Sequence, residues 1–242
     1  MELEPNTDNW LADTRASYDT VADSYADQVR NLLDDTPEER AVLALFAARV
    51  RENGEGPVAD MGCGPGRITA HLHGLGLEAF GIDLSPGMIE VARRDHPGLR
   101  FEPGSMTELG LTDGSVAGLI AWYSLIHVPD EEIDPVLAHF RRVLRPGGPL
   151  LLSFHVGDER KLKTQGYGGH PMKVYVHRRR PGQLAARLEE AGFDVEVQRT
   201  LTSAESKLGG LLLARRRPDA RSGTPAAPGK SEGSVDGSTP LL

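Results

Sequence analysis

An acidic residue followed by three alternating glycines is the pattern in this chain that most clearly indicates chemistry. Asp60 ends a short apolar run, and Gly62, Gly64 and Gly66 follow it at every second position. The apolar run predicts a buried strand, and apolar residues at near-helical spacing beyond the glycines predict a helix. Glycines at such a junction let a ligand approach the backbone closely, and the free N–H groups of the helix start point toward that ligand. A ligand-binding turn is therefore a better interpretation than a plain connection.

A second carboxylate, Asp83, narrows the choice of ligand. It ends the next predicted strand, 78–83, about 20 residues after the glycines, where a strand–helix–strand unit carries its ribose-binding acid. A dinucleotide fingerprint needs its third glycine one position later, where this chain has Arg67, and the Lys-Ser/Thr pair of a phosphate-binding loop is missing. The residues therefore predict a nucleoside ligand, without a clear indication of a pyrophosphate.

Several motifs together resemble those of the class I S-adenosylmethionine-dependent methyltransferases, over about residues 15–217. The likeness rests on Asp60-x-Gly62-x-Gly64-x-Gly66, Gly81-Ile82-Asp83-Leu84-Ser85, residues 123–129, residues 140–148 and Tyr18-Asp19-x-x-Ala22-x-x-Tyr25. The last of these resembles the lid helix of the small-molecule branch of the family. The resemblance implies S-adenosylmethionine as cofactor, S-adenosylhomocysteine as its product, and a small molecule as methyl acceptor.

The resemblance also implies which residues hold the donor. The glycines would pass beneath its methionine and ribose parts, and Asp83 would bind the ribose hydroxyls. Ser105 stands where the family often has an acid for the adenine amine, so we expect the backbone of Met106 to make that contact. Tyr18 and Tyr25 share one helix face and would close the site, unless they only anchor their helix. The predicted donor-binding set is Tyr18, Tyr25, Asp60, Gly62, Cys63, Gly64, Gly66, Asp83, Leu84, Met88, Gly104, Ser105, Met106, Ala121 and Trp122.

Three histidines are candidates for the catalytic group that takes a proton from the acceptor, because histidine suits proton transfer near neutral pH. His155 ends the predicted fifth strand, at the sheet edge where ligands bind. His170 lies in the segment 156–180, and His127 begins a helix beside the donor. A structural role is the alternative for each, and an amine or acidic phenol would need no base. The sequence shows neither paired histidines on one helix face nor a cluster of acids, so we expect no metal ion.

The elements that must position these residues alternate between strand and helix, which predicts a parallel sheet with right-handed crossovers. The expected fold class is α/β: a Rossmann-like, seven-stranded, mostly parallel sheet with helices on both faces, an antiparallel last strand and an N-terminal helical lid. The expected strands are 57–61, 78–83, 99–102, 116–122, 149–155, 193–198 and 209–214. The expected helices are 17–33, 37–51, one that starts after Ser85, and 181–191.

One domain over residues 15–217 accounts for most of the chain. Within it, 15–55 would form the N-terminal helices and lid, and 156–180 would be an insertion that caps the substrate. Residues 1–14 are expected to be flexible. The tail 218–242 is rich in Gly, Ser, Pro and Ala without periodicity, which predicts disorder.

Composition is typical of a soluble protein, and we expect a monomer or homodimer in the cytoplasm. The single cysteine, Cys63, forms no internal disulfide and is better interpreted as a small residue in a tight turn than as a nucleophile. The sequence contains no apolar run of about 20 residues and no basic-then-apolar leader, so we expect neither membrane contact nor a signal peptide. A formal net charge of −8 argues against a DNA partner.

The main prediction is methyl transfer to oxygen, nitrogen or carbon of a small molecule, by in-line displacement in a lidded pocket. RNA methylation is an alternative, because bases gather over residues 141–187; few aromatics interleave with them, so a solvated surface is the simpler interpretation. A protein that binds the donor without methylating is a second alternative. A nicotinamide oxidoreductase is a third, although Arg67 argues against it. The bases are Arg141, Arg142, Arg145, Lys161, Lys163, Lys173, Arg178, Arg179 and Arg180.

Overall fold

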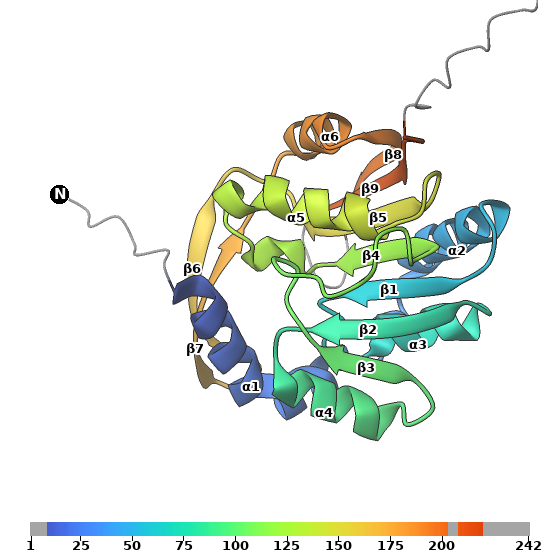
Figure 1. Cartoon of the computed structure of the whole chain (residues 1–242). Coiled ribbons are helices and arrows are strands. Elements are labelled where there is room, and N and C mark those ends of the chain that lie inside the picture. The colour runs from blue at the N-terminus through green and yellow to red at the C-terminus, as the bar shows by residue number, and fades with distance from the viewer. Residues whose placement is uncertain (1–8, 203–207, 220–242) are drawn as a thin grey trace, which may run out of the picture.

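Seven strands form one sheet in the order β3-β2-β1-β4-β5-β9-β8 (Figure 1). The computed structural model describes residues 9–202 and 208–219. The parallel strands are β1 (Pro57–Met61), β2 (Glu78–Asp83), β3 (Arg100–Pro103), β4 (Gly118–Trp122) and β5 (Pro149–His155). β9 (Gly209–Arg216) runs antiparallel both to β5 and to β8 (Phe193–Leu201). The expected fold class is therefore confirmed.

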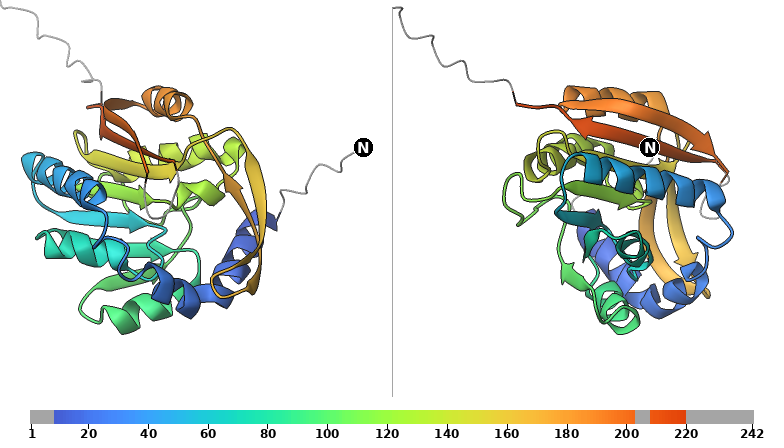
Figure 2. Two further views of the ribbon diagram at one scale, coloured as in Figure 1. Left: turned by 180° about the vertical axis from the view of Figure 1, so that it is seen from behind. Right: turned by 90° about the vertical axis from the view of Figure 1, so that its right-hand side faces the viewer.

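Helices cover both faces of this sheet. α2 (Pro37–Glu52) and α3 (Arg67–Gly74) lie on one face, and α5 (Asp130–Val143) lies on the other (Figures 1 and 2). Because both faces are covered, β4 is buried along its whole length, which is why its sequence is a continuous apolar run. α6 (Pro181–Glu190) packs on β8 and β9, close to its predicted range.

The first helix, α1 (Trp10–Val29), starts well before the expected position of residue 17 and ends before residue 33. The expectation that residues 1–14 are flexible is thus wrong for 10–14, and residues 1–8 lie outside the described part. Tertiary contacts explain the early start: the backbone N–H of Lys173 donates to Ser17 Oγ (2.8 Å), and Lys173 Nζ pairs with Asp13 (2.8 Å). Such contacts are invisible in the local sequence.

The segment 156–180, expected as an insertion, contains a β-hairpin that the sequence analysis did not predict. β6 (Arg160–Gly166) and β7 (His170–His177) pair antiparallel and form a separate two-stranded sheet. β7 packs on α1, and both lie beyond the carboxyl ends of the parallel strands (Figure 1). The hairpin was missed because β6 is mostly exposed and lacks the apolar–polar alternation of a half-buried strand.

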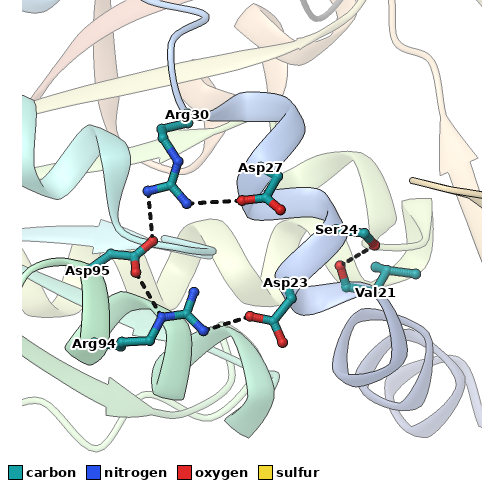
Figure 3. A network of polar contacts seen from close by, with 7 residues as sticks. All are labelled: Val21, Asp23, Ser24, Asp27, Arg30, Arg94 and Asp95. Atoms are coloured by element: carbon teal, nitrogen blue, oxygen red, sulfur yellow. Dashed lines mark hydrogen bonds and ion pairs between the residues drawn. The ribbon is translucent and has the colours of Figure 1, made fainter.

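Polar contacts tie α1 to α4 (Pro86–Asp95) at both ends of α4. At its N-terminus, Asp19 accepts hydrogen bonds from Ser85 Oγ (2.6 Å) and from the Gly87 backbone N–H (2.9 Å). At its C-terminus, Asp95 pairs with Arg30 of α1 (3.1 Å) and with Arg94, which in turn reaches Asp23 of α1 (Figure 3). α1 is therefore fixed across the sheet edge where the predicted site lies.

The expected disordered tail, 218–242, falls mostly outside the described residues, from residue 220 onward. Its first acid, Asp219, pairs with Arg141 and Arg216 (2.7 Å each). Over the described residues, every helix is too short or too polar to cross a lipid bilayer.

Candidate active site

The glycine turn after β1 has a backbone that only glycine adopts readily. Gly62, Gly64 and Gly66 have φ values of +71°, +54° and +84°. A Cβ added at Gly62 would stand 2.4 Å from Ser124 Cβ, and one at Gly66 would stand 2.6 Å from the Phe101 ring. Gly66 is also the N-cap residue of α3. The sequence pattern therefore reflects both the backbone conformation and the lack of room for side chains.

Asp83, at the end of β2, closes this turn from the neighbouring strand. Its two carboxylate oxygens accept hydrogen bonds from the backbone N–H groups of Gly64 (2.8 Å) and Ser85 (2.9 Å). Burial raises the pKa of Asp83 to about 6, while the backbone hydrogen bonds act in the opposite direction, so the group is mainly ionised at neutral pH. Each carboxylate oxygen has a second acceptor position, which leaves capacity for a ligand hydroxyl.

Asp60 lies beneath the turn rather than at its surface. Its Oδ2 accepts a hydrogen bond from Thr69 Oγ1 (2.7 Å), whereas Oδ1 is buried without a partner among the described residues. Burial raises the pKa of Asp60 to about 7, so this carboxyl is close to half-protonated at neutral pH. Asp60 thus anchors the turn to α3.

A cleft of about 770 Å³, counting the solvent at its mouth, opens between the glycine turn, Asp83 and α1. We call it the donor cleft. The predicted residues that line it are Tyr18, Tyr25, Gly62, Gly64, Asp83, Leu84, Met88, Gly104, Ser105, Met106, Trp122 and His127. The predicted residues that do not line it are Asp60, Cys63, Gly66, Ala121, His155 and His170. Sequence reasoning missed the remaining lining residues, which are Trp10, Leu11, Thr14, Arg15, Met61, Ile82, Ser85, Thr107, Tyr123, Ser124 and Val128.

Cys63 faces away from the donor cleft. Its thiol packs in a buried apolar cluster with Ile89, Ala92 and Phe101. Burial raises the pKa of this thiol well above its ordinary value, so the reactive thiolate is scarce at neutral pH. The interpretation of Cys63 as a small residue that fills a tight turn agrees with this position.

His127 joins three elements at the wall of the donor cleft. It ends the 3-10 turn η2 (Leu125–His127) instead of beginning a helix as expected. Its Nδ1 lies 2.8 Å from the carbonyl oxygen of Tyr175 in β7, and its Nε2 lies 2.7 Å from Tyr18 Oη in α1. Because a carbonyl only accepts, Nδ1 carries the proton, and Nε2 accepts a hydrogen bond from the Tyr18 hydroxyl.

Comparison with known proteins agrees with this geometry. Residues 58–148, from the start of β1 to the turn before β5, match the family model described as a methyltransferase domain. The seven-stranded sheet with its reversed β9 is the Rossmann-like fold shared with solved methyltransferases to which the chain is similar. Residues 58–148 therefore carry a methyltransferase domain, and the fold around them is the α/β, Rossmann-like one.

Individual relatives give the same assignment for the fold. An uncharacterised 37.1 kDa protein of a Streptomyces fradiae transposon is 32% identical over 193 residues, which cover 74% of this chain and 54% of that protein. A ubiquinone biosynthesis O-methyltransferase of Xanthomonas axonopodis pv. citri is 29% identical over 170 residues, 64% of this chain and 69% of that enzyme. The solved DhpI–SAH complex has a TM-score of 0.65 at 20% identity and covers 88% of this chain and 100% of that one. The chain spans about half the length of several curated relatives that it matches.

Two histidines predicted as catalytic candidates lie outside the donor cleft of this methyltransferase domain. His155 ends β5 with its ring 5.2 Å from that of Tyr123, and its Nδ1 is buried without a partner among the described residues. Burial lowers the pKa of His155 to about 4. His170 is exposed at the start of β7. Of the three candidates, the fold therefore brings only His127 to the donor cleft.

A buried arginine holds the loop of the methyltransferase domain that carries His127. Arg179 donates from Nη1 to the carbonyl of Leu125 (2.9 Å), from Nη2 to that of Val128, and from Nε to Asp130 (3.0 Å). Burial lowers the pKa of its guanidinium, although the nearby carboxylate opposes this effect. In the sequence Arg179 was only one of a run of bases, and nothing local distinguishes it from Arg180, which is exposed.

Most bases of the predicted basic patch, Arg179 included, form ion pairs with acids. The ion pairs are Arg141–Asp219, Arg142–Asp113, Lys161–Glu159, Lys173–Asp13, Arg178–Glu159, Arg179–Asp130 and Arg180–Asp158. These pairs are spread over α5, the hairpin and the loop that follows it. Among the described residues, no three His, Cys, Asp or Glu side chains are grouped as a metal site would require.

Proposed function

We propose that this chain transfers the methyl group of S-adenosylmethionine to a small-molecule acceptor. The observation that carries the proposal is the ionised carboxylate of Asp83, which is hydrogen-bonded to Gly64 across the turn and lines the donor cleft. Carboxylates at this position of a strand–helix–strand unit bind the two hydroxyls of a ribose. When bound, S-adenosylmethionine supplies an electrophilic methyl group on a positively charged sulfur.

The described residues fit this cofactor. Both polar and apolar side chains line the donor cleft, as in small-molecule sites. At Gly64 an added Cβ would meet only Tyr25 Cε1, at 3.6 Å, so the missing side chain leaves the turn open on the cleft side. Met88 and Met106 give the cleft an apolar wall of the kind that an adenine ring requires. Asp83 supplies the acceptor for the ribose.

Tyr18 and His127 are the residues best placed to move a proton. Burial lowers the pKa of His127 to about 4, so its imidazole is neutral at pH 7 and Nε2 has a free lone pair. Burial also raises the pKa of Tyr18 well above its ordinary value, so the phenol stays protonated and donates to that lone pair. An acceptor hydroxyl that donates to Tyr18 Oη would lose its proton to this oxygen, while the Tyr18 proton passes to His127 Nε2.

A small acceptor suits the position of α1 and the β6–β7 hairpin. Both lie over the carboxyl ends of the strands, where they limit access by a macromolecule and help to exclude water. The ion pairs of the basic residues weaken the alternative of RNA binding, because phosphate binding needs bases without acidic partners. The relationship to a ubiquinone O-methyltransferase favours oxygen as the methylated atom.

The proposal is tested by isothermal titration of the full chain with S-adenosylmethionine, S-adenosylhomocysteine and NADH. We expect affinity for the first two and none for NADH. Asp83→Asn should weaken binding of both by about tenfold or more, because the amide cannot replace both acceptor oxygens. Asp113→Asn, which changes an exposed acid paired with Arg142, is the matched control and should bind normally. Binding of NADH alone, or unchanged affinity of Asp83→Asn, would refute the proposal.

A further inference from the structure

A second pocket of about 750 Å³, counting the solvent at its mouth, lies between the N-terminal half of α1 and the β6–β7 hairpin. It shares Trp10, Thr14 and His127 with the donor cleft, so these side chains separate the two spaces. His127 therefore lines both the donor cleft and the second pocket. The proposed binding of the donor leaves this second pocket without a role.

Arg160 is the charge in the second pocket that has no partner of opposite sign. Within residues 9–202 and 208–219 its guanidinium forms no ion pair, and it lies 4.7 Å above the Tyr175 ring. The other lining cation, Lys173, pairs with Asp13 at 2.8 Å. His127 is neutral at pH 7, and so is His177, whose pKa burial lowers to about 4. The second pocket therefore presents one uncompensated positive charge.

The position of Arg160 above the Tyr175 ring prepares it for an anion. The attraction between the guanidinium and the ring face restricts the side chain before any ligand arrives, so less entropy is lost on binding. A guanidinium carries its N–H groups in one plane, in the arrangement that matches a carboxylate. Trp10 and Tyr175 add aromatic surface to the same pocket.

We propose that the second pocket binds the methyl acceptor, and that this acceptor is an aromatic monoanion of the carboxylate class. Its charge meets Arg160, its ring packs against Trp10 and Tyr175, and its reactive group points past His127 into the donor cleft. This inference rests on the proposed function, because it assigns the acceptor of that reaction. The alternative is that Arg160 is a solvated surface charge without a ligand.

The test uses the full chain saturated with S-adenosylhomocysteine and two probes of nearly equal shape, 2-naphthoate and 2-naphthamide. In isothermal titration we expect the anion to bind about tenfold or more tightly than the neutral amide, as one charge-assisted contact would give. Arg160→Gln should abolish this difference, and Arg160→Lys should keep part of it. Arg100→Gln is the matched control, because Arg100 is also an exposed arginine above an aromatic ring, 3.9 Å from the centroid of Phe80, but lies on β3.

The outcomes separate this inference from the proposed function. If S-adenosylhomocysteine fails to bind the unmodified chain, the proposed function itself fails. A second outcome is that S-adenosylhomocysteine binds all variants with the same affinity, but the unmodified chain binds the two naphthyl probes with the same affinity or binds neither. The assignment of the second pocket is then wrong, whereas the donor site stands. An anion preference that survives in Arg160→Gln, or that Arg100→Gln removes equally well, would also overturn the assignment.

Discussion

The Tyr18 hydroxyl donates a hydrogen bond to Nε2 of His127 across 2.7 Å, although the two residues are 109 positions apart. The same imidazole donates from Nδ1 to the Tyr175 carbonyl, so one ring links α1, η2 and β7. The position of α1 beside the donor cleft and the placement of His127 thus depend on the same contacts. A variant that loosens one of these contacts should therefore affect both.

Replacing His127 by Gln should lower kcat by about a hundredfold for a hydroxyl acceptor, because the amide oxygen can still accept from Tyr18 but cannot take a proton. Initial rates measured with S-adenosylmethionine and any acceptor found to be turned over would check this. His170→Gln is the control, since that side chain is exposed outside the donor cleft. Full kcat in His127→Gln would remove histidine from the proposed proton path.

Acid should destabilise the protein partly through His127. Its pKa is about 4 in the folded chain against an ordinary value of 6.5, so the unfolded state binds the proton more readily. The contribution of neutral His127 to the free energy of unfolding is therefore complete above about pH 6.5 and is lost as pH falls toward about 4. Between about pH 7.5 and about pH 5 this loss amounts to about 2 kcal/mol. His127→Gln should lack this component. Urea unfolding of the unmodified chain and of His127→Gln at the two pH values isolates the His127 component. The opposing contributions of Asp60 and Asp83 are present in both proteins and cancel in the comparison. Identical pH dependence in the two proteins would contradict the expectation.

Gly66→Ala should lower the free energy of unfolding by about 1–2 kcal/mol from the backbone alone, because Gly66 adopts the left-handed region at φ +84°. The contact of the new Cβ with the Phe101 ring, at 2.6 Å, adds to this loss. Thermal and urea unfolding would measure it. At Gly98 no atom lies within 4 Å of an added Cβ and φ is not positive, so Gly98→Ala should be tolerated. Equal stability of the two variants would contradict the expected strain.

Arg179→Met should cost about 3 kcal/mol of stability, because it leaves buried carbonyl groups of the η2 loop without their donor. Arg180→Met is the neighbouring control. Arg180 is exposed and, within the part of the chain that the structure describes, pairs only with Asp158, so this change should affect stability little. Chemical unfolding of both variants checks the difference. If Arg179→Met were as stable as the control, the loop that carries His127 would be held by other contacts.

Local sequence was sufficient for most strands of the sheet and for the glycine turn after β1. β1, β2 and β5 match the predicted ranges, because continuous apolar runs bounded by glycine and proline have few alternatives to a buried strand. The glycines and Asp83 were likewise recognisable, since a positive φ and a strand-end carboxylate leave a sequence signature. Ser85 marked the start of α4 through its cap on the Met88 N–H.

Tertiary structure alone decided which polar side chains meet. The sequence presented His127, His155 and His170 as equivalent candidates, and only the packing of η2 against α1 and β7 brings one of them to the donor cleft. It also presented Arg179 as one member of a basic stretch and did not single out Arg160. Folding buries Arg179 and leaves Arg160 at a pocket, without an ion pair among the described residues. Periodicity reports which face of an element is buried, but the partner across that face depends on contacts between residues far apart in the chain.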